Sequence, residues 1–226
     1  YDGALVFEIF ERGFAEFFRE KPASAVYLDY DATEFGITSV CFDNRNAAVA
    51  VAEMLMDLGH RRFAFFGPQL GGKAWSDPAM MERLRGVMDV VSRRGGLFLA
   101  QHILSAANKD MEASLQPILG VRPQERPTAI VVAHTGYLWI LQQAHEKGLL
   151  RIPQDISVAV IGSPEAKNFG GMEWGGAFFD SVRMGLSAVA ALRGQIVKGE
   201  APGRLILEGF SVENGATLAS PPSPGA

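Results

Sequence analysis

The segment that decides the fold runs from Val40 to Pro68 and reads VCFDNRNAAVAVAEMLMDLGHRRFAFFGP. Asp43 and Asn44 end a β-rich run and belong to the residue types that cap helices. Apolar residues then recur every three or four positions, as on one helix face, until Gly59 supplies the left-handed residue that closes the helix. The apolar run 63–66 is typical of a strand that is covered on both faces. Strand, helix and strand within 29 residues therefore predict a parallel βαβ unit.

The same alternation continues along most of the chain, which predicts an α/β fold with parallel sheets flanked by helices. We expect strands at 4–7, 25–28, 38–42, 63–66, 98–104, 129–133, 156–161 and 205–208. We expect helices at 10–18, 45–58, 77–91, 111–119, 137–147 and 181–198. The glycine-rich stretch 162–176 is expected to be irregular. In such folds, ligands bind beyond the carboxyl ends of the strands.

Composition narrows the possible functions. The net charge of −4 argues against a surface that grips nucleic acid by itself, because such domains are strongly basic. The lone cysteine, Cys41, excludes an internal disulfide and is expected to be a buried thiol. No signal peptide or membrane-length apolar run occurs. His134 has no second histidine at ligand spacing, so neither a metal nor another cofactor is expected.

Six motifs in order resemble the effector-binding core of LacI/GalR-family transcriptional regulators. They are D-G-A-L-V at 2–6, D-N with G-H-R-R at 43–62, R-x-x-G at 83–86, P-T-A-I at 127–130, I-P-Q-D-I-S-V at 152–158 and E-N-G-A-T at 213–217. The resemblance implies a two-lobed type I periplasmic-binding-protein-like fold. It assigns 1–59 and 178–207 to an N-terminal lobe, and 60–177 and 208–226 to a C-terminal lobe. It also implies that the first lobe is incomplete here, because the family's helix-turn-helix and the first two βα units of that lobe are absent from this sequence.

The resemblance implies a sensor rather than an enzyme. A small-molecule effector (a sugar, a nucleoside or a small acid) would bind between the lobes of a cytoplasmic homodimer, with no membrane partner. Operator DNA would be bound by a separate N-terminal domain. Two alternatives remain open: a periplasmic solute-binding protein of the same fold, and an enzyme on a doubly wound sheet. The stretch GPQLGGKA at 67–74 fits the first part of a phosphate loop but lacks the hydroxyl that would ligate Mg²⁺.

Five residues are candidate ligand contacts, and each has a structural alternative. Arg83 begins a helix at the R-x-x-G motif, where a guanidinium can hold carboxylate, phosphate or hydroxyl groups; otherwise it is a surface arginine. Asp43 accepts ligand hydroxyl groups or caps its helix. His134 and Glu165 follow buried strands and contact the ligand, or else His134 caps a helix and Glu165 faces solvent. Trp75 stacks on a ring or packs against its own lobe.

The sequence departs from the family where the effector pocket is expected. The family places Asn-Asp after the strand 129–133, and here His134 and Thr135 stand there. The family aspartate that follows V-I-G is replaced by Pro164. Loss of this acceptor beside Arg83 predicts that an acidic or aromatic molecule binds better than a neutral sugar.

Overall fold

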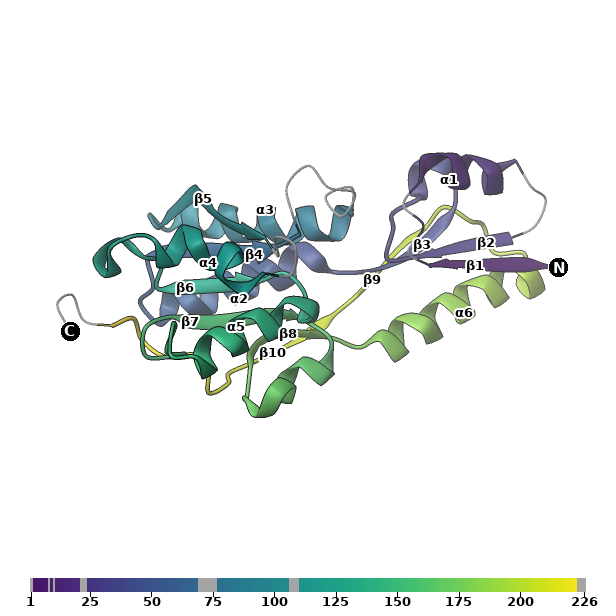
Figure 1. Ribbon diagram of the computed structural model, residues 1–226. Helices are drawn as coiled ribbons and strands as arrows, with labels where there is room; N and C mark the ends of the chain where they lie inside the picture. The colour runs from purple at the N-terminus through teal and green to yellow at the C-terminus, as the bar shows by residue number, and fades with distance from the viewer. Residues whose placement is uncertain are drawn as a thin grey trace.

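The computed structural model describes residues 2–7, 9, 11–20, 24–68, 77–105 and 110–222, which form two α/β lobes placed end to end (Figure 1). The N-terminal lobe contains β1 (Gly3–Phe7), α1 (Arg12–Arg19), β2 (Ser24–Leu28), the 3₁₀ turn η1 (Thr33–Phe35), β3 (Thr38–Phe42), α6 (Ser181–Lys198) and β9 (Leu205–Glu208). The C-terminal lobe contains α2 (Asn44–Asp57), β4 (Arg62–Gly67), α3 (Pro78–Arg93), β5 (Leu97–Ser105), α4 (Met111–Leu119), η4 (Pro123–Glu125), β6 (Ala129–Val132), η5 (Thr135–Tyr137), α5 (Leu138–Glu146), β7 (Ser157–Gly162), η6 (Pro164–Gly171), β8 (Gly175–Phe179) and β10 (Phe210–Glu213).

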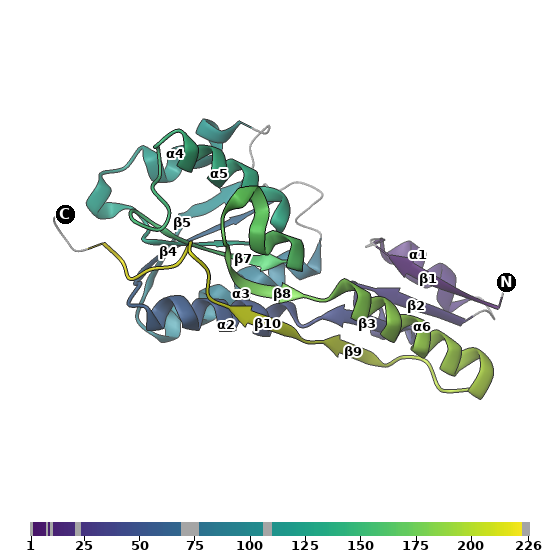
Figure 2. The ribbon, with the colours of Figure 1, turned by 90° about the horizontal axis from the view of Figure 1, so that it is seen from below.

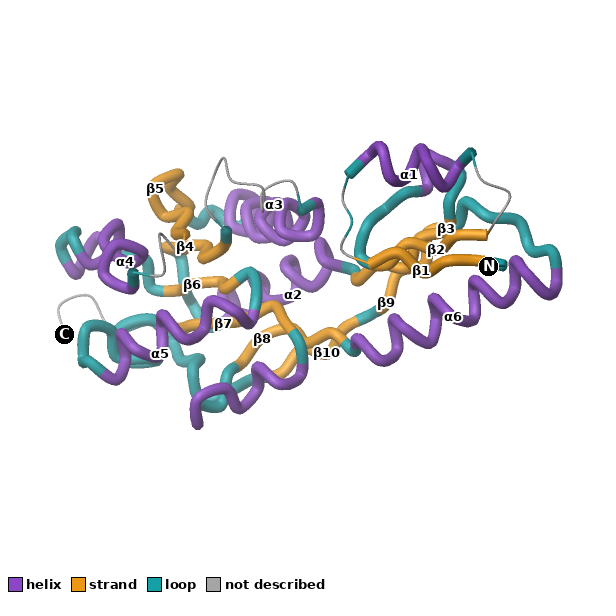
Figure 3. Tube along the Cα trace, turned by 45° about the vertical axis from the view of Figure 1, so that its right-hand side comes forward, coloured by secondary structure: helices purple, strands orange, loops and turns teal. Residues whose placement is uncertain are grey.

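Each lobe is built on one sheet. The four strands of the N-terminal lobe are parallel in the order β1-β2-β3-β9. The C-terminal sheet has the order β10-β8-β7-β6-β4-β5, and β10 is antiparallel to β8. Helices cover both faces of both sheets (Figure 3). Helices α2 and α3 cover one face of the C-terminal sheet, α4 and α5 cover the other, and α1 and α6 lie on opposite faces of the N-terminal sheet.

The expected α/β architecture is confirmed, but the sequence pattern predicts neither β8 nor β10. Strand β8 begins with Gly175 and Gly176, which are poor strand formers. At Gly176 the φ angle is 150°, and a Cβ there would lie against the backbone of Val160 on the neighbouring strand. The glycine therefore permits the close approach of β8 to β7, and a residue with a side chain could not.

The chain crosses between the lobes three times, and two crossings differ from the expected positions. Helix α2 packs on α3 and the C-terminal sheet, so the first crossing lies at 42–44 instead of 59–60. The second lies at 179–181, between β8 and α6, instead of between 177 and 178. The third lies at Gly209, between β9 and β10 (Figure 2). The apolar face of α2 is buried against the C-terminal lobe. The spacing of its apolar residues predicts a helix but cannot show which lobe will bury that helix.

The G-H-R-R motif has a structural role. His60 is fully buried; its Nδ1 lies 3.0 Å from Thr128 Oγ1 and its Nε2 lies 2.9 Å from the carbonyl oxygen of Ala219. The carbonyl can only accept, so Nε2 carries the hydrogen and the threonine hydroxyl donates to Nδ1. Arg61 donates to the carbonyls of Met56 and His60 at the end of α2. The motif therefore fastens the C-terminal segment to the base of the C-terminal sheet.

This arrangement predicts a pH-dependent contribution to stability. Burial lowers the pKa of His60 below its ordinary value of 6.5, against the opposing effect of the hydrogen bond to Ala219. The unfolded chain therefore binds more protons at this residue, and its stabilising contribution is complete above pH 6.5 and declines as the pH falls below it. The free energy of unfolding, measured with urea, should therefore fall less between pH 7.5 and pH 5.5 in His60→Asn than in the wild-type chain. Equal losses would contradict this role.

Candidate functional site

A hydrogen-bonded chain of side chains joins the two lobes at the first crossing. Arg83, near the start of α3, is 4% exposed, and its Nε donates to Oδ1 of Asn44 at 2.7 Å. Its Nη1 donates to the carbonyl oxygen of Ala133 at the end of β6. Asn44 Nδ2 in turn donates to the carbonyl oxygen of Phe42, the last residue of β3, at 3.2 Å. Asn44 therefore connects the edge of the N-terminal sheet to the interior of the C-terminal lobe.

Asp29 lies at the N-terminal end of this chain of contacts, directly after β2. Its backbone has a φ of 57°, a left-handed conformation that costs free energy for residues other than glycine. Its Oδ1 is shielded from water and has no hydrogen-bond partner. Burial raises the pKa of Asp29 to about 6, although the charge of Arg83 and hydrogen bonds from the Asn44 side chain and the Phe42 backbone lower it. A strained backbone and an unsatisfied carboxylate are typical of functional sites.

The buried charge of Arg83 is balanced within the protein. Burial lowers the pKa of Arg83 to about 10, and the carboxylates of Asp29 and Asp77 oppose this change. The guanidinium also lies 5.2 Å from the ring centroid of Phe179 at the end of β8. The rings of Phe42 and Phe179 stack at 4.4 Å, so an aromatic pair closes the junction between the lobes beside Arg83.

A cavity of about 270 Å³ opens at this junction. Its lining residues come from both lobes: Asp29, Asp31, Cys41, Phe42, Asp43, Asn44, Arg45, Pro78, Ala79, Glu82, Leu205 and Leu207. Burial raises the pKa of the Cys41 thiol to about 12, so this cysteine is a poor nucleophile. The cavity lies beyond the carboxyl ends of β2 and β3, where α/β folds bind ligands.

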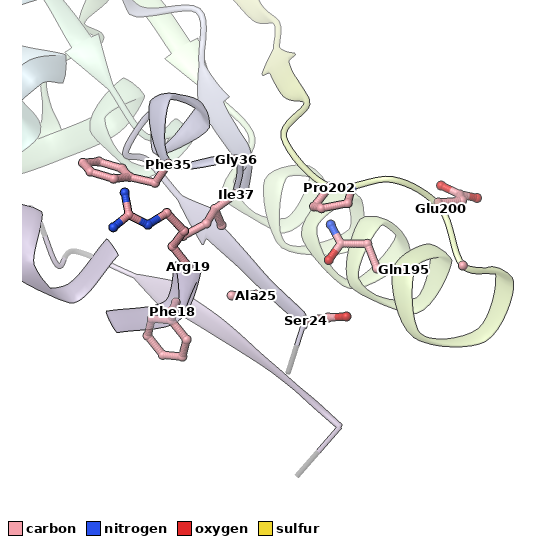
Figure 4. Close-up of a pocket in the computed structure, with 11 residues that line it drawn as sticks. Phe18, Arg19, Ser24, Ala25, Phe35, Gly36, Ile37, Gln195, Glu200 and Pro202 are labelled. Atoms are coloured by element: carbon pink, nitrogen blue, oxygen red, sulfur yellow. The ribbon is translucent and has the colours of Figure 1, made fainter. Parts of the chain in front are cut away.

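A second cavity, of about 340 Å³, lies at the opposite end of the N-terminal lobe (Figure 4). It is formed by one lobe, and two of its polar side chains have partners within that lobe. Gln195 donates to Thr38 Oγ1 at 2.8 Å, and Glu200 accepts from Arg204 at 2.9 Å. We therefore place the functional site at the junction, where residues of both lobes meet around the unsatisfied Asp29.

The structure places four of the five predicted ligand contacts. Arg83 is buried at the junction and is not a surface residue. Asp43 lines the cavity and also caps α2, where it accepts from the backbone and the side chain of Asn46. His134 is exposed and caps η5, since Nδ1 accepts from the backbone of Gly136 at 3.0 Å. Glu165 is exposed, and a hydrogen bond from Ser163 lowers its pKa.

Part of the prediction cannot be placed. Trp75 and most of the phosphate-loop-like stretch 67–74 lie outside the described residues.

Within the described ranges, no three histidine, cysteine, aspartate or glutamate side chains are grouped so that they could hold a metal ion. Of the helices that the structure describes, none has both the length and the apolar character needed to cross a bilayer.

The sequence prediction missed Asp29, Asn44 and Asp77. Asp29 follows the apolar strand 25–28, just as Asp43 follows the strand 38–42, so a search for polar residues at strand ends could have found it. Asn44 and Asp77 are capping residue types at helix starts, and nothing in the local sequence separates a cap from a contact across the lobe junction.

Comparisons with known proteins agree with this architecture. The sequence profile of the periplasmic binding protein-like domain matches residues 52–218. A LacI-type transcriptional regulator of Bacillus cereus subsp. cytotoxis has a TM-score of 0.80 and 21% identity, over 96% of this chain and 75% of that one. A LacI-family regulator of Mycobacterium smegmatis has a TM-score of 0.78 and 21% identity, over 97% and 80%.

The regulator CelR, in complex with cellobiose, has a TM-score of 0.79 and 17% identity over 96% of this chain and 66% of that one. No curated protein matches the chain in sequence. The profile match covers most of the chain, and the solved structures share its two-lobed fold. The chain therefore belongs to the periplasmic binding protein-like domain family and has the fold of the effector-binding core of LacI/GalR-type regulators.

Proposed function

We propose that this chain is the effector-sensing domain of a LacI/GalR-like transcriptional regulator, which binds a small polar molecule between its lobes. The observation that carries the proposal is the run of contacts from Asp29 through Asn44 to Arg83. It joins the lobes beside a cavity and leaves one carboxylate oxygen without a partner. No covalent chemistry is required, and the site is a binding site.

The contacts suggest how binding would change the arrangement of the lobes. Asn44 is the first residue of α2 and lies at the first crossing, so it touches both lobes. A ligand that donates to the unpartnered oxygen of Asp29 on the N-terminal lobe and also touches Pro78 or Glu82 of α3 contacts both lobes at once. A ligand shifts the equilibrium between two lobe arrangements only if it binds them with different affinities, and this shared contact supplies such a difference.

The proposed partners follow from the same family. We propose further that the chain acts in a cytoplasmic homodimer whose operator DNA is bound by a separate N-terminal domain, because its neighbours in fold are described as transcriptional regulators. A two-fold symmetric dimer suits a palindromic operator. The chain's net charge of −4 agrees with a sensing role that leaves DNA contacts to another domain.

Asp29→Asn tests the site, because asparagine tolerates the left-handed backbone while losing the charge. At pH 7 the ionisation of Asp29 costs free energy in the folded wild-type chain, where its pKa is about 6, and it does not do so in the unfolded chain. The variant should therefore be about 1–2 kcal/mol more stable at pH 7, a gain that disappears below about pH 4, where both states are protonated.

The same variant should bind effector less tightly. A thermal-shift screen of small polar molecules identifies compounds that stabilise the wild-type chain, and calorimetry then compares their affinities for the two proteins. Glu165→Gln is the matched control, because it removes an exposed carboxylate away from the cavity. Equal affinities in all three proteins, or the absence of any stabilising compound, would contradict the proposed function.

A further inference from the structure

We propose that the ligand of the junction cavity is an organic cation, namely an amine carried on an apolar body. This inference rests on the proposed function, because it names the chemical class of effector for the same cavity. It is based on the charge around the cavity, the spacing of the carboxylates, the apolar part of the wall and the unsatisfied oxygen of Asp29.

Carboxylates outnumber cations around the cavity. Among the residues that the structure describes, the wall contains one guanidinium, that of Arg45, and four carboxylates, those of Asp29, Asp31, Asp43 and Glu82. Arg45 is already paired with Glu82 and Asp89, and Glu82 also pairs with Arg85. The excess of negative charge therefore comes from Asp29, Asp31 and Asp43, which form no ion pair with the described residues. A ligand that enters this wall therefore meets an excess of negative charge.

Arg83 does not reverse this balance. Its Nε and Nη1 donate to Asn44 and Ala133, and its charge lies between the carboxylates of Asp29 and Asp77. An anionic ligand would have to displace these internal partners and approach the carboxylates of the wall. The charge balance therefore argues against the acidic effector expected from the sequence.

The carboxylates are not placed to chelate a metal. In the part of the chain that the structure describes, no group of three acidic, histidine or cysteine side chains could hold an ion. Separated carboxylates suit a larger cation, whose ammonium group pairs with one of them while its body occupies the remaining space. A neutral polyol could donate hydrogen bonds to the same oxygens, but it would leave the excess charge uncompensated.

The rest of the wall is apolar. Phe42, Pro78 and the β9 residues Leu205 and Leu207 line the cavity, and the two leucines are 44% and 54% exposed. A ligand with a hydrocarbon or aromatic body would cover this surface and remove it from water. The combination of apolar side chains and carboxylates matches a molecule that has a cationic group at one end.

Asp29 is the residue that such a group would pair with. Its Oδ1 has no donor and is shielded from water, which is costly for a carboxylate oxygen. The charged groups around it are Arg83 and Asp77 from the C-terminal lobe, and Asp31 and Asp43 at the neighbouring strand ends. An ammonium group favours the ionised form of Asp29, so binding should weaken as the pH falls below about 6, the pKa of this residue.

The experiment compares probes that have the same shape and different charge. Benzylamine and benzyl alcohol form one pair, cyclohexylamine and cyclohexanol form another, and benzoate is the anionic probe. Calorimetry at pH 7.5 should show that each amine binds at least fivefold more tightly than its alcohol and that benzoate does not bind. The affinity of the amines should fall at least fivefold at pH 5.

Two variants complete the test. Asp29→Asn should lower the affinity for the amines at least fivefold, and Glu112→Gln, which removes an exposed carboxylate on α4, should leave it unchanged. An alcohol or benzoate that binds as tightly as the amine, or an amine whose binding is unchanged by Asp29→Asn, would overturn the inference. If an alcohol binds as tightly as its amine and loses that binding in Asp29→Asn, the inference is wrong but the proposed function is supported.

If none of these probes binds, the inference is also wrong. The proposed function fails only if the wider screen finds no stabilising compound either.

Discussion

Replacing Arg83 with methionine is expected to lower the free energy of unfolding by about 3 kcal/mol. The substitution keeps an unbranched apolar stem but removes the guanidinium, which leaves two buried acceptors, Asn44 Oδ1 and the carbonyl oxygen of Ala133, without their donor. An unsatisfied buried acceptor costs about 1–3 kcal/mol. The carboxylate of Asp29 also loses the positive charge that opposes the rise of its pKa. Urea unfolding at pH 7 measures the loss.

Arg85→Met is the matched control for this prediction. Arg85 lies two residues further along α3, is exposed and pairs with Glu82 on the surface at 2.7 Å. Exposed ion pairs contribute little, so the control should change stability by no more than about 0.5 kcal/mol. Arg83→Lys should fall between the two, because a lysine keeps the charge but cannot donate in two directions from a planar group. Equal stability of Arg83→Met and Arg85→Met would show that the contacts across the junction do not contribute to the fold.

The strand and helix pattern could be predicted because its physical causes are local. Apolar residues at helical spacing, a capping residue at the start and Gly59 at the end define α2 without reference to the rest of the chain. Strands β8 and β10 could not be predicted in this way. A glycine that permits strand contact has the same local signature as a glycine in a loop, and the distinction depends on Val160 of the neighbouring strand.

For the candidate site, too, the sequence predicts what is local and misses what depends on contacts between distant residues. The R-x-x-G motif placed Arg83 at a helix start near a junction, but it could not show whether the guanidinium faces a ligand or the protein itself. That depends on Asn44 and Asp29, which the fold brings to Arg83 from distant parts of the chain. Asp43 and His134 illustrate a second difficulty, since residue types that bind ligands also cap helices, and the structure shows that both form caps.

The glycine of the R-x-x-G motif has a separate role, which predicts a second large effect. A Cβ on Gly86 would lie 2.7 Å from the carbonyl oxygen of Arg45 and 2.8 Å from Cβ of Ala48, both on α2. These distances are too short for real contacts, so alanine would force α2 and α3 apart. Crowding of this kind typically costs about 1–3 kcal/mol. We expect Gly86→Ala to lower the free energy of unfolding by about 2 kcal/mol, despite the better helix propensity of alanine.

Gly185→Ala on α6 separates packing from propensity, because a Cβ at Gly185 meets no atom within 4 Å. With no clash to offset it, this substitution should raise stability by about 0.5–1 kcal/mol. The two variants therefore carry the same chemical change and opposite expected signs in urea unfolding. Because α3 also carries Arg83, separation of the helices in Gly86→Ala should lengthen the 2.7 Å contact between Arg83 and Asn44 and weaken effector binding, whereas Gly185→Ala should leave binding unchanged. A Gly86→Ala protein as stable as the wild type would show that α2 and α3 can repack around a methyl group, and the motif would then need another explanation.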